Sequence, residues 1–598
     1  MFRPLLAALA AGLFSVTDLS AATVEVKAEG ADKALLSALR DASLSVGAIA
    51  REVSDGQELL AAAQADYKRM VAALYAAGRF GGAVSIKVDG REAAALSVLN
   101  KLPEIDRIEI AVTPGPAYRF AEARIAPLPG GATPAPGFAV GALATTPAMR
   151  KAAEAGVTGW REIGHAKARV AGQQITANHT KTEIRASIAL DPGPRLRFGA
   201  TQIASDATPS KVRPERIRAI AGIETGTQFS PDEVAAAERR LRRTGAFRSA
   251  VVSEAEQPNP DASLDMIVAV EDAKPRRFGF GVEASTTEGA SVTTYWLHRN
   301  LLGGAERFRV DASLKGLDTG TLGGDTDGID YGITASLIRP AFRHPDMNLR
   351  FAANLQHVDE PAYWSNLAEA TIGVQRFVSE EITLDADIGL RLAHVSDAYG
   401  TRNFNHLIGR AAITWDRRNN DLDPTRGFFL NAEAKPFFGL DGSDTGARLF
   451  TDLRAYVPLG SDRFSLAGRV QAGSVVMAPL SGTPPEYLFF SGGGGTVRGQ
   501  DYQSLGGSTI AGQQVGGRSF LGLSGEVRAK ITSKIGLVGF VDYGYVAADT
   551  QFGGGTWHGG AGLGGRYYTP IGPIRVDVAV PVTGPSGLGV YVGIGQAF

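Results

Sequence analysis

The chain of 598 residues contains no cysteine, which excludes disulfide bonds and thiolate-bound metal sites. It also lacks an excess of basic residues, since its formal net charge is −1, and this balance argues against nucleic acid as a partner. Beyond the first residues, no uninterrupted apolar run approaches the roughly 18 residues that a transmembrane helix needs. If the protein crosses a membrane, we therefore expect it to do so as a β-barrel.

Motifs of common enzyme classes are missing as well. The glycine run Gly492–Gly495 is not followed by the Gly-Lys-Ser/Thr of a phosphate-binding loop. The eight histidines show no metal-ligand spacing, and no Gly-x-Ser-x-Gly elbow with matched partners is present. We interpret Asp385 and Asp387 as residues that line a water-filled lumen and not as an acid–base pair. The sequence thus predicts a protein that is not an enzyme and that uses no cofactor or metal ion.

The N-terminus predicts export from the cytoplasm. Arg3 precedes a short apolar run, and small residues follow at Ala21 and Ala22. This order is typical of a secretory signal peptide, which we place at residues 1–22. The alternative is a buried N-terminal helix.

The first half of the chain contains a threefold repeat. A helix-to-strand junction that begins with glycine recurs at Gly78, Gly164 and Gly245. A helical pattern precedes each junction, and an alternating strand follows it. We predict three mixed α/β modules of about 80 residues, each with the order strand–helix–strand. Their predicted limits are residues 23–116, 117–194 and 195–275.

The helix predicted for the third module, Ser230–Thr244, carries four arginines. They are Arg239, Arg240, Arg242 and Arg243. One interpretation is a basic face for lipid headgroups or a partner. The favoured interpretation is a solvated face near the negative C-terminal end of the helix dipole.

The second half, residues 276–598, predicts a membrane β-barrel. Most of the excess among the 74 glycines lies here, and apolar residues alternate with polar ones. In Ile382–Leu392, for example, every second residue is apolar and the others include Asp385, Asp387 and Arg391. We count sixteen antiparallel strands, from 277–287 to 589–598. Because the number is even, the chain enters the first strand and leaves the last strand on the same side of the membrane.

The stretch Ser491–Gly507 stands out as a loop held against another surface. Its glycines give access to backbone angles that other residues avoid, and Arg498 and Tyr502 lie near its tip. It follows the eleventh predicted strand, so it lies at the end of the barrel opposite the modules. The alternative is that Arg498 is an ordinary exposed loop arginine.

Strand parity identifies partners for Arg498. In the strand that contains residues 536–546, Phe540, Asp542 and Gly544 must face the lumen. In the preceding strand, Glu526 faces inward as well. The guanidinium fork suits a carboxylate, so we expect Arg498 to bind Asp542 first and Glu526 second. Such a pair could be a static brace or could tune the shape of the barrel.

Several of these motifs resemble one known superfamily. The pattern Val497-Arg498-Gly499-x-x-Tyr502, the Phe540-x-Asp542-x-Gly544 motif and a terminal aromatic residue are similar to motifs of the outer-membrane protein-assembly superfamily. That superfamily includes the BamA and TamA insertases and the two-partner-secretion transporters. The resemblance implies that the loop folds into the barrel and that its arginine docks on a wall acid. It also implies that the modules are POTRA domains in the periplasm, whose sheet edges recruit clients or merely act as spacers.

Three modules and sixteen strands resemble the TamA branch of the superfamily. That resemblance implies a bacterial outer-membrane protein that helps to insert autotransporters and other barrel proteins. It implies three kinds of partner: a TamB-like protein anchored in the inner membrane, unfolded clients and outer-membrane lipid. The rival expectation is a two-partner secretion pore that passes an unfolded protein through its lumen, and a passive porin is a third option.

The proposed insertion mechanism requires a seam between the first and last barrel strands. An opened seam would offer edge strands that template an incoming client strand. Glycines in the last strand would weaken it there. The seam residues that we single out are Phe278, Gly279, Gly593, Gly595 and Phe598.

Overall fold

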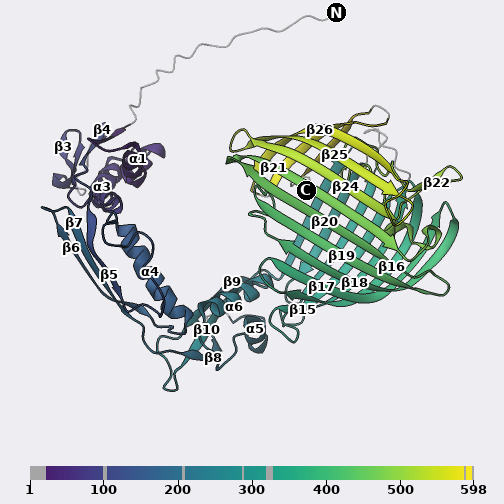
Figure 1. Ribbon diagram of the computed structural model, residues 1–598, viewed down its shortest axis with the longest axis horizontal. Helices are drawn as coiled ribbons and strands as arrows, with labels where there is room; N and C mark the ends of the chain where they lie inside the picture. The colour runs from purple at the N-terminus through teal and green to yellow at the C-terminus, as the bar shows by residue number, and fades with distance from the viewer. Residues whose placement is uncertain are drawn as a thin grey trace, which may run out of the picture. The chain divides into compact units, whose positions relative to one another are not determined.

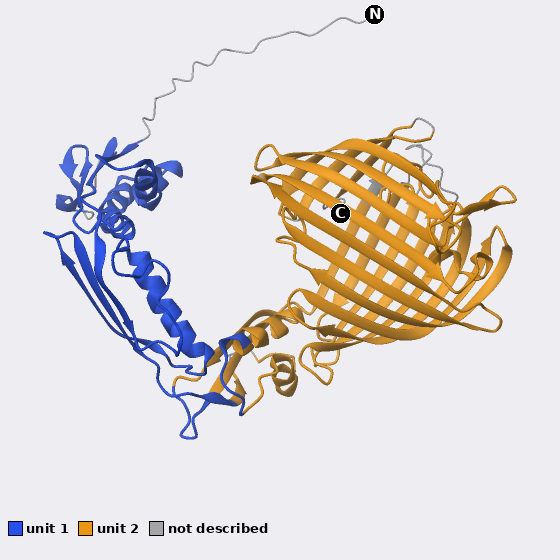
Figure 2. Ribbon diagram, viewed as in Figure 1, with its two compact units in different colours: residues 1–199, 226–232, 257–264 blue, residues 200–225, 233–256, 265–598 orange. Residues whose placement is uncertain are grey.

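A computed structural model of the chain describes residues 22–97, 104–204, 209–285, 289–317, 328–570, 572–584 and 587–594. Most of the predicted signal peptide and the seam residues Gly595 and Phe598 lie outside the described residues. The chain folds into two compact units, and the second unit contains the barrel (Figure 2). Among the described helices, none is both long and apolar enough to span a membrane.

The first sheet has four strands with three helices packed on it. It has the order β1-β4-β2-β3 and contains a parallel β1–β4 pair. Asp66 is buried and accepts hydrogen bonds from Ser43 Oγ at 2.7 Å and from Leu44 N at 2.6 Å, so it fixes the start of α2. The elements are β1 (Thr23–Ala28), α1 (Lys33–Ala42), α2 (Leu44–Ala50), α3 (Gly56–Ala76), β2 (Ala83–Val88), β3 (Arg91–Glu92) and β4 (Arg107–Thr113).

The second sheet has three strands in the order β5-β7-β6. β5 (Arg119–Ala126) runs parallel to β7 (Glu183–Asp191), whereas β6 (Arg169–Asn178) is antiparallel to β7. Thr145 caps the helix α4 (Thr146–Glu162), because its side chain accepts a hydrogen bond from the backbone N–H of Ala148. The apolar side of the helix packs on the sheet. Because β6 is an edge strand and mostly exposed, one side of it is open to another chain.

A third sheet has the order β8-β10-β9. Its antiparallel β9–β10 pair follows two helices, which belong to the same compact unit as the barrel. The elements are β8 (Arg197–Ile203), α5 (Pro214–Ala221), α6 (Pro231–Arg243), β9 (Phe247–Glu254) and β10 (Ser263–Asp272). The mixed α/β character predicted for the N-terminal part is thus confirmed.

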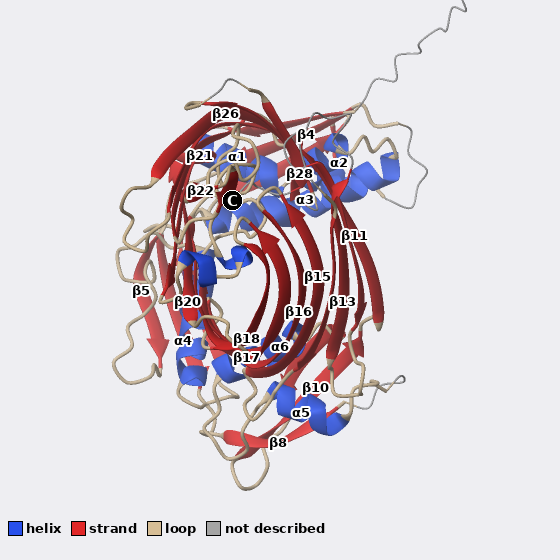
Figure 3. Ribbon diagram, turned by 90° about the vertical axis from the view of Figure 1, so that its right-hand side faces the viewer, coloured by secondary structure: helices blue, strands red, loops and turns tan. Residues whose placement is uncertain are grey.

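The barrel consists of sixteen strands, each antiparallel to its neighbours (Figures 1 and 3). It closes where β11 and β28 pair, at Ala284 with Val592 and at Ser285 with Tyr591. This confirms the predicted fold class and strand number. The strands are β11 (Arg276–Ser285), β12 (Gly289–His298), β13 (Arg307–Leu317), β14 (Asp330–Arg339), β15 (Met347–Glu360), β16 (Tyr363–Phe377), β17 (Ile382–Asp397), β18 (Gly400–Asp416), β19 (Gly427–Leu440), β20 (Gly446–Leu459), β21 (Ser461–Val476), β24 (Ser519–Lys530), β25 (Ile535–Ala547), β26 (Thr556–Thr569), β27 (Gly572–Pro581) and β28 (Gly589–Ile594).

The barrel has a near end and a far end. The near end is the one where β10 leads into β11, and the far end is the opposite one, where odd-numbered barrel strands lead into the next strand. Along β17, Ile388 and Leu390 are exposed on the outer face, whereas Asp385, Asp387 and Arg391 are buried inside. Asp387 is paired with Arg410 at 3.1 Å. The lumen therefore contains paired charges, as the alternation predicts.

Two of the four arginines of α6, Arg240 and Arg243, do not face solvent, so the favoured interpretation of that helix is wrong for these two. Arg240 and Arg243 each lie 2.9 Å from Asp346, which precedes β15 at the near end of the barrel. The guanidinium of Arg243 also lies 3.6 Å from the ring centre of Phe377. Only 10% of the Arg240 side chain is exposed. We call the contact of Arg240 and Arg243 with Asp346 and Phe377 the arginine clamp.

A further arginine of α6, Arg239, pairs with Glu380 at 2.7 Å on the next near-end turn. Arg242 behaves as the favoured interpretation expects, because it is exposed and pairs with Glu238 of its own helix. The sequence pattern of the helix did not reveal these contacts, because the acid partners of Arg239, Arg240 and Arg243 lie on turns more than 100 residues away in the sequence.

Candidate functional site: a buried arginine in the barrel lumen

The glycine-rich stretch belongs to the long connection between β21 and β24. Two short 3₁₀ turns open this connection, Leu480–Gly482 and Pro485–Tyr487, and a small hairpin of β22 (Ser508–Ile510) and β23 (Gln513–Val515) ends it. Between them the loop closes on itself, because the backbones of Ser491 and Leu505 bond to each other in both directions. The predicted loop thus has a defined internal structure.

Arg498 binds Asp542 as a two-pronged fork. Its Nε donates to Oδ2 of Asp542 at 2.7 Å and its Nη2 donates to Oδ1 at 3.0 Å. The backbone N–H of Arg498 also donates to Oδ2, at 3.2 Å. Only 3% of the arginine side chain and 1% of the Asp542 side chain are exposed. Asp542 is therefore the main partner, as strand parity indicates.

Two more carboxylates complete the surroundings of Arg498. Nη1 donates to Glu526 Oε1 at 2.9 Å and lies 3.4 Å from Asp577 Oδ2. The excess of negative charge is balanced by other cations, since Arg528 binds Glu526 at 2.8 Å and Arg566 binds Asp577. Because all these groups are buried, loss of one charge would leave another without compensation.

An aromatic ring supports the guanidinium from one side. The ring centre of Phe540 lies 3.5 Å from Cζ of Arg498, which is the geometry of a cation–π contact. Phe540 is itself only 6% exposed. The arginine is thus held by hydrogen bonds in its plane and by an apolar face above it, so its orientation is fixed.

Glycines at the contact allow the loop backbone to approach the wall. Gly499 has a φ of +89°, and a Cβ placed on it would lie 2.7 Å from the backbone of Val580 on β27. A Cβ on Gly560 of β26 would lie 1.9 Å from the carbonyl oxygen of Arg498. Side chains at these two positions are therefore excluded by the docked loop.

The residues that follow Arg498 contact the last strands. Gly499 N–H donates to the hydroxyl of Tyr591 on β28 at 3.0 Å. The side chain of Gln500 donates to the carbonyls of Gly559 and Thr583, both at 2.7 Å. The docked loop therefore reaches from β24 to β28, the strand that pairs with β11.

Most of the predicted site residues meet at one place. Val497, Arg498 and Gly499 lie against the inner wall, and Asp542, Glu526 and Phe540 face them. Gly544 belongs to the same contact, since a Cβ there would lie 2.9 Å from Cγ2 of Val497. Tyr502 lies elsewhere, because its hydroxyl donates to Glu360 at the far end of β15, at 3.1 Å.

Sequence reasoning missed Asp577, Gln500 and Tyr591 as parts of this site. The alternation along residues 574–580 places Asp577 on the lumen side, but alternation does not show its height along the barrel. Gln500 and Tyr591 carry no signal of their own, because their contacts depend on how deep the loop enters. The described residues contain no cluster of three or more His, Asp or Glu residues arranged to hold a metal ion.

Among the seam residues that the structure describes, Phe278, Gly279 and Gly593 form no hydrogen bond or ion pair with Arg498. Phe278 and Gly279 belong to β11, and Phe278 is 73% exposed on the outer face. Gly593 belongs to β28 and pairs with Arg575 of β27. The neighbouring strands β11 and β28 thus form the predicted meeting point of the first and last strands.

Mixed α/β modules before a sixteen-stranded barrel, with an arginine loop docked on the inner wall, define a class of outer-membrane barrel protein. Residues 300–598, half of the chain, match the Omp85 superfamily domain. The chain therefore belongs to the Omp85 superfamily, whose members act in outer-membrane protein assembly or secretion. Membership implies a barrel in the outer membrane with the modules in the periplasm.

Solved structures support the same fold. BamA from Haemophilus ducreyi lacking POTRA domains 1–3 aligns with a TM-score of 0.62 at 18% identity, over 80% of this chain and 100% of that one. CdiB from Acinetobacter baumannii aligns with a TM-score of 0.51 at 13% identity, over 81% of this chain and 90% of that one. The two likenesses concern the fold alone.

Proposed function

We propose that this protein assists the insertion of β-barrel proteins, including autotransporters, into the outer membrane. A client strand would be templated at the seam of β11 and β28. The activity would not be enzymatic and would need no cofactor, because strand pairing and release of apolar surface from water provide the driving force. A TamB-like periplasmic protein anchored in the inner membrane would be the partner.

The observation that carries this proposal is the reach of the docked loop. Arg498 contacts Asp577 on β27, and the next residue, Gly499, donates to Tyr591 on β28. The loop therefore braces the strands on one side of the seam but makes none of these contacts with β11. Docking of the loop would keep β27 and β28 in place, and a change in docking would alter how readily β28 separates from β11.

The second module offers a place to receive an unfolded client. A groove of about 550 Å³ lies between α4 and the edge strand β6, lined by residues such as Met149, Val157 and Ile175. Ile175 is 46% exposed. An extended client strand could add to β6 through backbone hydrogen bonds and place apolar side chains in this groove.

A disulfide lock across the seam tests the proposal. The natural chain has no cysteine, so the pair Ala284→Cys and Val592→Cys, which are register partners, can be oxidised without side reactions. We expect oxidation to reduce client insertion into vesicles by at least about tenfold, and a reducing agent to restore it.

A matched control uses Ala335→Cys with Ala353→Cys, register partners on β14 and β15. This pair crosslinks two barrel strands away from the seam, so we expect it to leave insertion unchanged. If the seam lock leaves the insertion rate at the wild-type value, templating at the seam is excluded.

A secretion pore is the second candidate, and the ion-paired lumen favours it, because polar walls suit passage of an unfolded chain. Three modules instead of the two usual in two-partner transporters weigh against it. The same lock separates the candidates: a pore would continue to secrete its substrate with β11 and β28 crosslinked, and would show a steady conductance in planar bilayers.

A further inference from the structure

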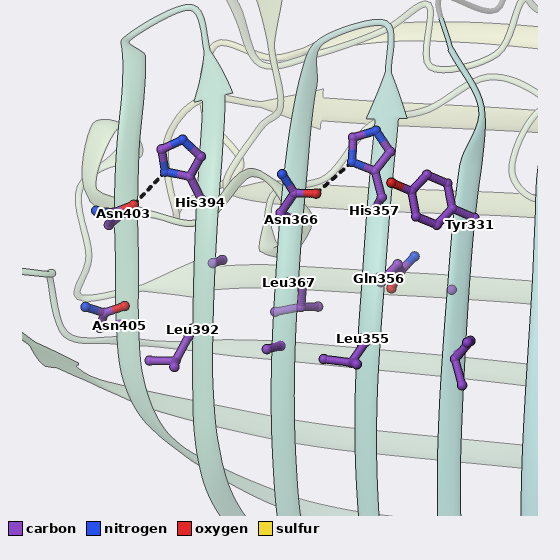
Figure 4. A pocket seen from close by; sticks show the side chains of 14 residues that line it. Tyr331, Leu355, Gln356, His357, Asn366, Leu367, Leu392, His394, Asn403 and Asn405 are labelled. Atoms are coloured by element: carbon purple, nitrogen blue, oxygen red, sulfur yellow. Dashed lines mark hydrogen bonds between the residues drawn. The ribbon is translucent and has the colours of Figure 1, made fainter.

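A groove lies on the outer face of the barrel at its far end, formed by β14 to β18 (Figure 4). Its volume is about 620 Å³. Its lower part is apolar, because Ile333, Leu355 and Leu392 are exposed there by 55%, 62% and 52%. In a membrane this face is covered by lipid, so the occupant of the groove is expected to be a lipid molecule.

The upper part of the groove is polar and repeats on two successive hairpins. His357 Nδ1–H donates to Asn366 Oδ1 at 2.8 Å across β15 and β16. His394 Nδ1–H donates in the same way to Asn403 Oδ1 at 2.6 Å across β17 and β18. Both histidines lie three residues before the end of their strand, toward the far end of the barrel, where we expect lipid headgroups.

These pairs leave hydrogen-bonding atoms directed at the groove. In the tautomer with the proton on Nδ1, Nε2 of each imidazole can accept a hydrogen bond, while the amide nitrogen of each asparagine is a donor. No partner for these four nitrogens is present among the described residues. An acceptor next to a donor matches a hydroxyl group, which can donate to one and accept from the other.

Aromatic rings extend the polar part of the groove. Tyr331 stacks on His357 with ring centres 4.8 Å apart, and Trp364 lies 5.4 Å from His394. The described residues that line the groove include no lysine or arginine. The groove therefore suits a neutral hydroxylated headgroup better than a phosphate, which would require a cation.

The distance between the two pairs indicates the size of the headgroup. β15 and β17 are separated by one strand, so the two histidines are roughly 10 Å apart at ordinary strand spacing. That span is on the order of two linked sugar rings. We propose that the groove binds a glycolipid of the outer leaflet, with a disaccharide headgroup on the two His–Asn pairs and an acyl chain over Leu355 and Leu392.

The test uses the full-length protein in vesicles that contain equal amounts of diglucosyl diacylglycerol, phosphatidylethanolamine and phosphatidylglycerol. Lipids that remain bound to the released protein are counted by native mass spectrometry. We expect the diglucosyl lipid to be enriched about tenfold over each phospholipid. The double variant His357→Ala/His394→Ala should reduce this enrichment to the bulk ratio.

His298→Ala, at the near end of the barrel, is the matched control and should retain the enrichment. Heat-modifiable mobility on gels reports whether each variant forms a barrel. If the double variant does not fold, Asn366→Leu and Asn403→Leu remove the amide donors instead and should have the same effect. Equal retention of the phospholipids, or enrichment that survives both double changes, would overturn the proposal.

Discussion

At the scale of single residues, the docked loop places one buried cation, Arg498, among three acids. Asp542 makes the forked contact and receives the backbone N–H, whereas Glu526 and Asp577 each contact only Nη1 of Arg498. The three acids are therefore not equivalent. Their order of importance follows from the number and length of these contacts.

We predict that Arg498→Lys will destabilise the barrel because lysine keeps the charge but loses the fork. Asp542→Asn should cost more than Glu526→Gln, and up to about 3–5 kcal/mol, since it leaves a buried cation poorly compensated. The stability of each variant is measured as the urea concentration at which heat-modifiable mobility of the barrel is lost. Equal effects of Asp542→Asn and Glu526→Gln would contradict the geometry.

A second prediction concerns two glycines of the same loop. Gly499→Ala should prevent docking, because its φ of +89° is unfavourable for alanine and the new Cβ would meet the backbone of Val580. Gly495→Ala is the control, since nothing lies within 4 Å of a Cβ at that position. Protease sensitivity of the loop should rise in the first variant and not in the second. If the loop were undocked in the native protein, neither variant would change its protease sensitivity.

At the scale of elements, the arginine clamp connects α6 to the turn before β15. Burial alone would raise the pKa of Asp346, but hydrogen bonds from Arg240 and Arg243 outweigh it and hold the pKa below its ordinary value. A lowered pKa means that the ionised carboxylate is stabilised in the folded protein. This contribution is present above the unfolded-state pKa and is lost as the pH falls through the folded-state value.

We predict that Asp346→Asn will release α6 from the barrel at neutral pH. Hydrogen exchange of α5 and α6 should speed up by roughly tenfold in the variant, in line with loss of about 1–2 kcal/mol from a partly buried ion pair. The wild type should show the same release only in strong acid. Glu380→Gln, which removes the exposed partner of Arg239, should have little effect.

At the scale of the whole molecule, the barrel and the first two modules have separate tasks in the proposed function. The ring of strand pairs from β11 to β28 closes without any strand of the modules. The groove at β6 belongs to the second module alone. We therefore expect the barrel to form without that module. Client capture, in contrast, is expected to require it.

Deletion of residues 23–194 should leave heat-modifiable barrel mobility unchanged and reduce client insertion several-fold. The same client should crosslink to a photoreactive residue at Ile175 in the full chain. Unchanged insertion after the deletion would mean that the first two modules are spacers. Insertion restored by adding back the β5–β7 module would instead support client capture at β6.

The sequence alone determined the features that repeat locally. Alternation of apolar and polar residues is a property of each strand by itself, so the strand number and the inward direction of Asp542 and Glu526 could be derived without coordinates. The glycine run likewise predicted a loop with unusual backbone angles. These signals need only neighbouring residues.

Only the tertiary structure decided which inward or exposed groups meet. Asp577 and Tyr591 reach the loop because of their height along the barrel, which parity does not contain. Asp346 meets α6 because a turn far away in the sequence lies beside it. The paired histidines of the outer groove align for the same reason: strand register sets contacts between residues whose sequence neighbours carry no mark of them.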